Sequence, residues 1–542
     1  MAAAVPTSAD RRTLAVSVAL ALGLTAAIAA RCVMATGGTL VYALDDPYIH
    51  LAMGRTLAQS GVWGVNEATP GAASSSPLWT FLLAGLTLLM GDAPVWLPLM
   101  LNVIAVAALV VVADAWLREL RVTARARVGV ILAMLLVGPV VPLAMTGMEH
   151  VAHAAAVLAL AMVVLRPKPA SAAAIAGVAA VATGLRYESA FVALALAVVL
   201  AVRTRWTKAM AAVVGSAAVV GAIGLWQISL GEGFLPNSVN VKAVSFSLAS
   251  ASQWLRWKGF SALQDASVAP MVVLPVLALA GALQTALLDR GDATGTSRAL
   301  AEMAGALALA TLVHITLSRT GWYFRYEAYL VVWGALGAGA ALVHGWRLTV
   351  DACRKADIPQ ALRPAMWTAG VAVGALVVLS TGLRINAYDT VHEYCRDIHL
   401  QHHQVARFLH AHYDDAGVVL HDIGYVGYLC DCRLVDMAGL ATRAVVMAKK
   451  RRAVAPELAR RLALQNGARI AVSYDTAWLP EEWLRVASWR NPANRAAGSD
   501  TVYFLAVEPQ AAGPLLRRLR DFEQRLPPGL EVTYLSNTAA SG

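Results

Sequence analysis

Two adjacent carboxylates, Asp45 and Asp46, are the most conspicuous polar feature near the N-terminus of the sequence. They come after an apolar run, and Pro47 then begins a predicted helix over Tyr48–Gln59, whose first turn favours acidic residues. Helix capping would account for one aspartate, but two together favour a functional role. Paired acids act as a general base toward an incoming hydroxyl group, or they bind a divalent cation such as Mg²⁺ or Mn²⁺. We therefore assign Asp45 and Asp46 as the candidate catalytic residues and leave the cation open.

Three basic residues are candidates for binding an anion. Arg186 lies at the end of a predicted helix, whereas Lys242 and Arg325, the latter followed by Tyr326, lie in predicted loops. Each cation alone is equally well explained as a side chain that reaches for lipid headgroups. If all three share one face of the protein, they supply the positive charge that a lipid-borne phosphate requires at that depth.

Further polar residues are candidates for contacts to a substrate. Glu149 and Glu188 begin predicted apolar helices, where the helix dipole would also stabilise them. Asn237 could hydrogen-bond a sugar or cap a helix. Asp422 follows a predicted strand, where it faces a cleft or caps the next helix. For each of these residues the structural and the functional interpretation both remain open at this point.

The histidine clusters are weak candidates for a metal site. The histidines that follow Glu149 lack the His-Glu-x-x-His pattern of zinc enzymes. For His399, His402 and His403 we favour a solvated helix face over zinc. The sequence also contains no P-loop, nucleophile elbow or kinase signature. We therefore predict no metal ligands beyond the aspartate pair, and we expect any donor substrate to be borne by the membrane.

The composition is that of a membrane protein. Hydrophobic residues make up 58% of the 542 residues, charged residues only 14%, and the mean hydropathy is +0.59. A soluble protein would contain about 25% charged residues. The net charge of +10 is explained by basic residues in loops that the positive-inside rule places in the cytoplasm. The partner that this composition indicates is membrane lipid, and nothing in it indicates nucleic acid.

Hydropathy and basic loops together predict about eleven membrane spans. The predicted spans cover approximately residues 13–36, 93–118, 128–146, 149–165, 170–185, 188–203, 208–229, 268–289, 298–318, 326–346 and 364–383. The first is interpreted as a retained helix rather than a cleaved signal peptide. The N-terminus then lies in the cytoplasm and the C-terminus outside, in the cytoplasmic (inner) membrane of a bacterium.

The apolar segment Pro77–Met90 is too short for a span, and counting it would place the basic loops outside. We predict that it is a helix at the outer interface. The first outer loop then covers residues 37–76, a second covers 231–264, and a third, short loop contains Arg325. The candidate side chains named above therefore share the outer face of the membrane.

The sequence predicts a mostly α fold with two domains. Residues 1–384 form the transmembrane bundle, and residues 385–542 form a polar, extracytoplasmic α/β domain. Strands predicted at 417–420, 468–472 and 502–507 alternate with helices predicted at 402–412, 456–466 and 515–526. If this domain is extracytoplasmic, Cys395 could form a disulfide with Cys430 or Cys432.

Several short motifs, which follow one another along the chain, resemble the motifs of a known family of proteins. They are Asp45-Asp46-Pro47-Tyr48-Ile49, Ser75-Ser76-Pro77-Leu78-Trp79, Thr146-Gly147-Met148-Glu149, the turn at Arg186 with Tyr187 in place of proline, Pro236-Asn237-Ser238 with Lys242, Asp422-Ile423-Gly424-Tyr425-Val426-Gly427-Tyr428, and Val435-Asp436-Met437-Ala438-Gly439-Leu440. Together they resemble the GT-C superfamily of polyprenyl-phosphate-sugar-dependent glycosyltransferases. Within it, the chain is most similar to the family of the mycobacterial terminal β-(1→2)-arabinofuranosyltransferase and its bacterial relatives.

The resemblance implies a GT-C-type membrane glycosyltransferase. Its donor would be a polyprenyl-phosphate sugar, with arabinofuranose as one candidate, and its acceptor a glycan, glycolipid or protein outside the cytoplasm. Asp45 or Asp46 would act near the anomeric carbon. The residues implied in substrate binding are Tyr48, Glu149, Arg186, Glu188, Asn237, Lys242, Arg325, Tyr326, Asp422 and Asp436.

The alternative from another class is a transporter or flippase of lipid-linked sugars. Transporters place ionisable groups near the middle of the bilayer, on broken helices. Here the predicted spans carry few charges, and the polar groups gather at the outer face. The pattern therefore favours the transferase.

Overall fold

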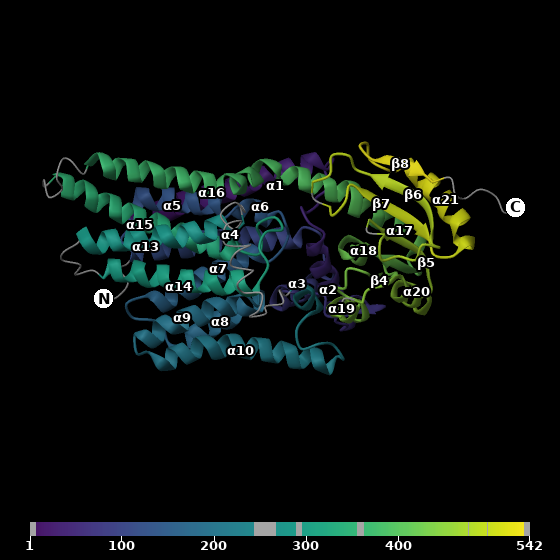
Figure 1. Ribbon diagram of the computed structural model, residues 1–542, viewed down its shortest axis with the longest axis horizontal. Coiled ribbons are helices and arrows are strands. Elements are labelled where there is room, and N and C mark those ends of the chain that lie inside the picture. The colour runs from purple at the N-terminus through teal and green to yellow at the C-terminus, as the bar shows by residue number, and fades with distance from the viewer. Residues whose placement is uncertain are drawn as a thin grey trace.

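The computed structural model describes residues 7–242, 267–288, 295–354, 363–451, 453–474, 476–495 and 497–535. It consists of a bundle of long helices with a mixed α/β domain at one end (Figure 1). The N-terminus lies at the opposite end of the bundle from this tail domain. Most of the predicted second outer loop, 231–264, lies outside the described residues.

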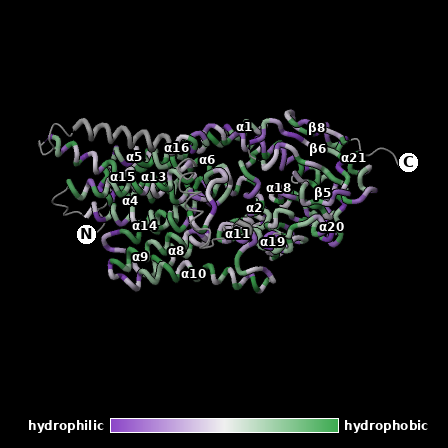
Figure 2. Tube along the Cα trace, viewed as in Figure 1, coloured by the Kyte–Doolittle hydropathy of each residue, from purple (hydrophilic) through white to green (hydrophobic). Residues whose placement is uncertain are grey.

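The bundle helices follow the predicted spans closely. They are α1 (Ser8–Ala35), α4 (Leu97–Glu119), α5 (Ala124–Val137), α6 (Val140–Ala144), α7 (His150–Leu165), α8 (Ala172–Leu185), α9 (Ser189–Val202), α10 (Trp206–Ser229), α13 (Ala269–Leu288), α14 (Thr296–Leu317), α15 (Ala328–Arg354) and α16 (Arg363–Ile398). Their apolar composition makes the bundle mostly green in Figure 2, whereas the tail domain is mixed. The described fold is therefore a helical bundle of membrane type.

Small residues allow the bundle helices to pack closely. A Cβ at Gly215 of α10 would lie 2.3 Å from the carbonyl oxygen of Ala176 in α8, and one at Gly281 of α13 would lie 2.6 Å from Ala341 Cβ in α15. Close backbone approach at small residues is typical of helix pairs in lipid, where apolar side chains gain nothing by leaving the solvent.

Six of the described helices are long and apolar enough to cross a bilayer: α1, α4, α10, α13, α14 and α15. The helices α7, α8 and α9 are apolar but contain only 14 to 16 residues. The predicted count of about eleven spans is therefore not confirmed. The predicted span 128–146 was wrong as one helix, because the helix breaks at Gly138 and Pro139 between α5 and α6. A helix is present at each of the other predicted positions. The predicted interfacial helix is present as α3 (Pro77–Met90).

The first outer loop is folded rather than extended. It contains α2 (Asp46–Ser60) and the short strands β1 (Gly64–Asn66) and β2 (Thr69–Pro70). Pro47 begins α2, and Gly61 ends it in the left-handed conformation that glycine adopts at little cost. This loop packs against both α3 and the tail domain.

The tail domain is built on one sheet in the order β4-β3-β5-β7-β6-β8. Its elements are η2 (His399–His403), α17 (Gln404–Tyr413), β3 (Gly417–Leu420), α18 (Gly424–Leu429), β4 (Arg433–Asp436), α19 (Arg443–Lys450), α20 (Pro456–Gln465), β5 (Ala468–Ser473), β6 (Leu484–Arg490), β7 (Thr501–Ala506), α21 (Pro509–Glu523) and β8 (Glu531–Tyr534). Strands β3, β4 and β5 pair in parallel, and β5, β7, β6 and β8 pair antiparallel. The α/β class predicted for this region agrees with this arrangement.

The tail domain and the first outer loop share one hydrophobic core. The core joins Tyr48 and Trp79 of the loop region to Phe408, Tyr425 and Trp489 of the tail domain. The helix α16 runs without a break through the predicted domain boundary at 384, so bundle and tail are also linked by a continuous helix. The division into residues 1–384 and 385–542 stays a prediction.

The predicted cysteine pairing does not match the packing. All five cysteines are free thiols. Cys395 packs in a cluster with Cys32 at the end of the bundle, because its position on α16 faces α1, whereas Cys430 and Cys432 belong to the core of the tail domain.

Candidate active site

Asp45 connects the first outer loop to the tail domain. Its Oδ2 accepts a hydrogen bond from the N–H of Gly424 at 2.7 Å, and its Oδ1 accepts one from the N–H of Tyr425 at 2.8 Å. These residues begin α18, and the first N–H groups of a helix have no partner within the helix. A Cβ at Gly424 would lie 2.1 Å from the carbonyl oxygen of Asp45, so the contact requires glycine at this position. We call this contact the Asp45 latch.

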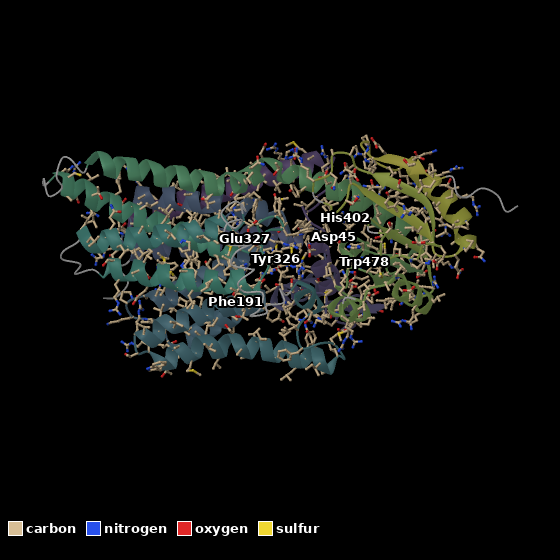
Figure 3. All side chains as sticks on the ribbon, in the orientation of Figure 1. Asp45, Phe191, Tyr326, Glu327, His402 and Trp478 are labelled. Carbon is tan, nitrogen blue, oxygen red and sulfur yellow. The ribbon has the colours of Figure 1, made fainter. Side chains whose placement is uncertain are left out.

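His402 lies beside Asp45 at the junction of bundle and tail (Figure 3). Asp422 lines the same cavity as these two residues. His402 Nε2 is 3.0 Å from Asp422 Oδ2. His402 lies in η2, a π-helical segment of the kind that often marks a functional site. The prediction of a solvated face was wrong for His402, because this side chain is buried against the latch.

The electrostatics of these three groups are coupled. Burial raises the pKa of Asp45 to about 6, although the charge on His402 and the two backbone N–H groups oppose the rise. Burial acts to lower the pKa of His402, but its hydrogen bond to Asp422 and the nearby carboxylates outweigh burial and raise it. Burial likewise raises the pKa of Asp422, but the hydrogen bond to His402 outweighs it and the net direction is down. An ion pair of His402 and Asp422 therefore lies beside a weakly acidic Asp45.

A small cavity opens on the tail side of Asp45. It is lined by Asp45, Gln401, His402, Asp422, Tyr425 and Tyr474, and its volume of about 30 Å³ is sufficient for about one water molecule. Gln401 Oε1 and His402 Nδ1 are buried, and neither has a hydrogen-bond partner among the described residues. Polar atoms of this kind are those that a substrate hydroxyl or a water molecule would satisfy.

Asp46 points to a different partner from Asp45. Its Oδ2 accepts a hydrogen bond from Nη1 of Arg325 at 3.0 Å. The same guanidinium donates through Nη2 to the Tyr326 hydroxyl at 3.1 Å and contacts the sulfur of Met148. Arg325 is 2% exposed, so its charge is compensated by Asp46 inside the protein.

The loop that carries Arg325 has an unusual backbone. Trp322, Tyr323 and Phe324 all have φ between 48° and 65°, in the left-handed region that non-glycine residues rarely occupy. A buried ion pair holds the end of this loop, where Nη1 of Arg384 lies 2.9 Å from Oε1 of Glu327 and both side chains are 0% exposed. Strained segments of this kind persist only where the surrounding structure determines them, and they gather at functional sites.

Arg186 is held between two carboxylates. Its Nη1 donates to Oε1 of Glu149 at 2.7 Å, and its Nη2 donates to Oε1 of Glu188 at 2.6 Å. The turn before Glu149 requires glycine, because Gly147 has φ +67° and a Cβ there would lie 2.7 Å from the ring of Tyr42. Three residues that the sequence analysis selected separately are thus one network.

A larger cavity of about 200 Å³ lies on the bundle side of the aspartate pair. Polar side chains of Ser75, Arg186, Glu188, Ser238, Arg319 and Tyr326 line one part of it, and Phe191, Val220, Leu235, Val239 and Leu317 line the apolar remainder. Arg186 Nε and Ser238 Oγ are buried here without a hydrogen-bond partner among the described residues. The cavity therefore combines an apolar wall from α9, α10 and α14 with unsatisfied donors.

The remaining predicted site residues are not all near these cavities. Tyr48 is fully buried, and its ring lies 3.9 Å from that of Tyr425, so it packs the latch. Asp436 caps a turn, because its carboxylate accepts from the N–H groups of Gly439, Leu440 and Ala441. The backbone N–H of Asn237 donates to Ala72 O, and its side chain hydrogen-bonds with Glu232. Lys242 ends α11 (Asn237–Lys242), and its side chain lies outside the described residues.

Sequence reasoning missed Gln401, His421, Tyr474 and Arg319 as residues of the two cavities. The cavity residues of the tail domain come from η2, from the ends of β3 and β5, and from α18, which are far apart in the sequence. A weak signal existed for His421, because side chains at the carboxyl ends of neighbouring parallel strands meet at one edge of a sheet.

Comparisons with known proteins agree with the fold. A domain of unknown function, DUF8728, matches residues 390–505, which include most of the tail domain. The search of curated proteins found no match. Among solved structures, ArnT from Cupriavidus metallidurans in the apo state aligns with a TM-score of 0.53 and 14% identity, over 94% of this chain and 100% of that chain.

A second solved structure is the oligosaccharyltransferase of Archaeoglobus fulgidus in the apo form. It aligns with a TM-score of 0.45 and 11% identity, over 93% of this chain and 78% of that chain. We base the fold class on the first alignment, which covers both the bundle and the tail. The chain has a GT-C fold, a transmembrane helical bundle followed by a domain with a β-sheet.

Proposed function

We propose that the protein is an integral membrane glycosyltransferase that transfers a sugar from a polyprenyl-phosphate donor to an acceptor outside the cytoplasm. The acceptor is a glycan, a glycolipid or a protein, and the membrane is the cytoplasmic membrane of a bacterium, with the tail domain outside. Arabinofuranose is the donor sugar that the sequence motifs favour. A fold alone does not define an activity, so the proposal rests on the site.

The observation that carries the proposal is the position of the aspartate pair between two cavities. Asp45 lines the small cavity against the tail domain, and Asp46 is paired with Arg325, whose neighbour Tyr326 lines the larger cavity against the bundle. A transfer from a lipid-linked donor to an acceptor that enters from the aqueous side fits this arrangement, with the donor bound on the membrane side.

Asp45 is the general base in this proposal. It takes the proton of the acceptor hydroxyl, the hydroxyl oxygen bonds to the anomeric carbon, and the bond from that carbon to the phosphate oxygen breaks. A pKa of about 6 suits a base that works near neutral pH, because such a group is ionised yet still basic. His402, with its raised pKa, lies beside Asp45 and stabilises the carboxylate.

The larger cavity receives the donor. The isoprenoid chain leaves along its apolar wall, and the phosphate lies near Arg186, Arg319 and Arg325. Arg186 and Arg325 already have carboxylate partners, so these guanidinium groups are positioned before the donor binds. Guanidinium groups fixed in this way bind phosphate with little loss of side-chain entropy.

The two aspartates do not have equal roles. Arg325 compensates the charge of Asp46, and His402 pairs with Asp422, so Asp45 is the carboxylate of the small cavity that we assign as the base. A single base favours direct displacement with inversion at the anomeric carbon. The same positive charge beside Asp46 opposes the binding of a divalent cation at the pair.

The flippase alternative has no observation of its own in its favour. Among the described residues, most buried charged groups of the bundle lie near the ends of its helices, and Arg384, in the middle of α16, pairs with Glu327 just before α15. Asp114 and Arg127 are near one end, and Glu149, Arg186, Arg325 and Glu327 are near the other. A transporter would place such groups near the middle of the bilayer.

The test uses the purified full-length protein in lipid nanodiscs with a panel of synthetic polyprenyl-phosphate pentoses and hexoses and an oligosaccharide acceptor. Mass spectrometry detects the glycosylated acceptor and the released polyprenyl phosphate. We expect the protein to consume one donor of the panel. One sugar should be added to the acceptor for each polyprenyl phosphate that is released. Sugar lipid that crosses the bilayer of a proteoliposome without forming a new glycosidic bond would instead establish the flippase.

A further inference from the structure

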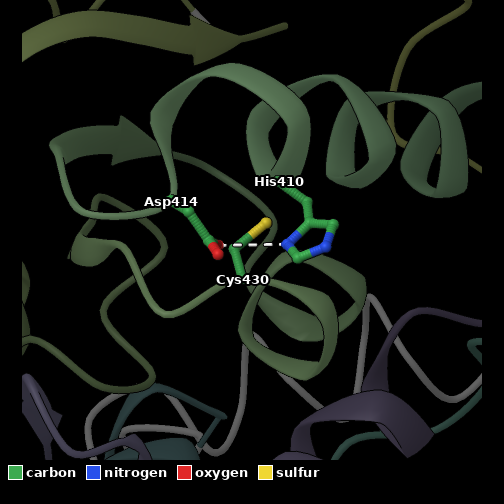
Figure 4. Close-up of side chains that lie close together, drawn as sticks. All are labelled: His410, Asp414 and Cys430. Atoms are coloured by element: carbon green, nitrogen blue, oxygen red, sulfur yellow. Dashed lines mark hydrogen bonds and ion pairs between the residues drawn. The ribbon is translucent and has the colours of Figure 1, made fainter.

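Three metal-ligating side chains meet in the tail domain, away from both cavities. His410 and Asp414 are one helical turn apart at the end of α17, and Cys430 directly follows α18 (Figure 4). One potential ligand atom from each residue, a nitrogen, an oxygen and a sulfur, lies within 4.8 Å of the other two. Bound zinc holds its ligands closer than this, with metal–ligand distances of about 2.0–2.3 Å, so small side-chain rotations would close the site.

A fourth ligand is available. The thiol of Cys432 hydrogen-bonds with that of Cys430. Cys432 is thus the neighbour of one grouped ligand, Cys430, and a rotation of its side chain would bring a second sulfur to the site. Sulfur, imidazole and carboxylate groups form the donor set of tetrahedral zinc sites.

The ligands are already oriented by their surroundings. Oδ1 of Asp414 accepts from the N–H of Asp431 at 3.0 Å and lies 3.2 Å from Nδ1 of His410. The Cys430 thiol donates to Ala406 O at 3.3 Å. Contacts of this kind around a metal site fix the first ligands. The His410 side chain is 57% exposed whereas Cys430 is buried, so an ion can reach the thiols from solvent past the imidazole.

An exposed histidine and aspartate at this spacing are also common on helices that bind nothing, where the pair contributes only tenths of a kcal/mol. That explanation accounts for His410 and Asp414. It does not account for the buried thiol of Cys430, which meets this pair from the end of α18 and is itself in contact with Cys432.

We propose that His410, Asp414, Cys430 and Cys432 bind one zinc ion. Binding releases the thiol protons to solvent, because the thiolate is the ligand. The ion joins the end of α17 to the end of α18, and the other end of α18 donates the Gly424 and Tyr425 N–H groups to Asp45. The metal is therefore a structural clamp on the short helix that forms the Asp45 latch. Its binding does not depend on the proposed function, but its effect on sugar transfer does.

The first experiment measures zinc in the full-length protein, purified without chelator. We expect about one zinc per chain by elemental analysis, and a thiolate-to-metal charge-transfer band after replacement with cobalt. Cys430→Ser and His410→Ala should weaken the metal affinity at least about 10- to 100-fold, the range seen when the ligand environment of a metal is disturbed. Cys353→Ser and His412→Ala are the matched controls, because they remove a thiol in α15 and a second imidazole of α17, and they should keep the metal.

The second experiment removes the metal from the wild-type protein with a chelator, which avoids variants that fail to fold. We expect a lower melting temperature that zinc restores and that magnesium does not. A protein with no zinc above the level of Cys430→Ser, or with Cys430 and Cys432 joined in a disulfide, would overturn the proposal. Zinc binding without any sugar transfer would leave the clamp standing and reject the proposed function.

Discussion

The central residues of the site are charged groups that each have a specific partner. Asp45 is held by two backbone N–H groups, Asp46 by Arg325, and Arg186 by Glu149 and Glu188. Buried charges of this kind are tolerated because each is paired or hydrogen-bonded. Removing one member leaves its partner unsatisfied, so variants at these positions need a readout of folding beside the readout of activity.

Arg325→Gln should weaken donor binding more than the chemical step. The substitution removes a cation beside the proposed phosphate site, and a charge-assisted hydrogen bond contributes about 1.5–3 kcal/mol. We therefore expect the KM for the donor to rise about 10- to 100-fold, with a smaller change in kcat. Initial rates over a range of donor concentrations measure both quantities.

The matched control is Arg31→Gln, which removes a half-exposed ion pair with Asp389 at the end of α1. Its donor KM should stay at the wild-type value. An unchanged KM in Arg325→Gln would exclude Arg325 from the phosphate site.

The pH dependence of transfer should report on Asp45. Because its pKa is raised to about 6, chiefly by burial, the base becomes protonated as the pH falls through that value. The value of kcat/KM should therefore fall on the acid side of about pH 6 and level off above it. Rates measured from about pH 5 to about pH 8 test this.

The contribution of Asp45 to the free energy of unfolding should change with pH in the opposite direction to the transfer rate. A carboxyl whose pKa is higher in the folded than in the unfolded state favours folding most when it is protonated. Its contribution is present below the unfolded value of about 4 and is lost as the pH rises through about 6. A rate that stays constant through this window would show that Asp45 is not the titrating base.

At the scale of elements, α18 decides the geometry of the site. It is a helix of six residues whose first N–H groups bind Asp45 and whose rings, Tyr425 and Tyr428, lie near Tyr48 of α2. The contact between α2 and α18 joins residues 379 positions apart in the sequence. A short helix gains little stability by itself, so its position depends on these tertiary contacts.

Gly424→Ala should break the latch without touching a carboxylate. The new Cβ would lie 2.1 Å from the backbone oxygen of Asp45, so α18 must move away and both hydrogen bonds lengthen. We expect transfer to fall at least about 10-fold and the free energy of unfolding to fall by about 1–3 kcal/mol, as for other overpacked sites. Transfer rates and thermal unfolding in detergent measure the two effects.

Gly513→Ala in α21 provides the control. Its Cβ would meet only the flexible end of Arg517, at 3.7 Å, and alanine in a helix is favoured over glycine by about 0.5–1 kcal/mol. It should therefore be neutral or slightly stabilising. Wild-type transfer in Gly424→Ala would show that the latch is dispensable.

The sequence predicts the elements better than their contacts. The lengths of the apolar segments and the positions of proline were sufficient to predict α2, α3 and the bundle helices. The short apolar runs of β3, β5 and β7 were sufficient to predict these strands. The strands β4, β6 and β8 were missed because each of them contains at least one charged residue, so none shows the uninterrupted apolar run that marks β3 and β7. Neither the position of α18 on Asp45 nor that of His402 beside it has a local signal, because both depend on packing between segments far apart in the chain.

The charged residues of the candidate site could be predicted from the sequence, but the ion pairs that they form could not. Asp45, Glu149, Arg186, Glu188 and Arg325 were selected as charges in apolar surroundings. Which carboxylate binds which guanidinium is decided by how the turns before α7 and α9 meet, and no residue spacing encodes this. We expected Asp436 to contact the substrate. In the structure its carboxylate caps a turn, and this capping is the better explanation for an aspartate at this position.

At the scale of the whole molecule, the fold places the tail domain at one end of the bundle and the N-terminus at the other (Figure 1). The small cavity lies at the junction of bundle and tail, and the larger cavity lies on the bundle side of it. Figure 3 shows Asp45 and His402 at this junction, with Tyr326 on the bundle side. The proposed reaction therefore requires the tail to be outside the cytoplasm, where the acceptor is.

The orientation can be tested with single cysteines introduced into a Cys353→Ser variant, whose four remaining cysteines are buried. Ser8→Cys lies at the exposed start of α1, and Glu531→Cys lies on the exposed strand β8 of the tail domain. A membrane-impermeant maleimide should label Glu531→Cys in spheroplasts and should label Ser8→Cys only after lysis. The reverse pattern would place the tail in the cytoplasm and contradict the proposed localisation.

The most direct measurement of the central claim is a single turnover with the matched donor, comparing the wild-type protein with Asp45→Asn and Asp46→Asn. Loss of a general base costs about 10²- to 10⁴-fold in rate, so Asp45→Asn should lose transfer by that factor while still binding the donor. Asp46→Asn should keep a larger share of the rate, because it leaves the base in place. Bond formation at the wild-type rate by a folded Asp45→Asn protein would contradict the account.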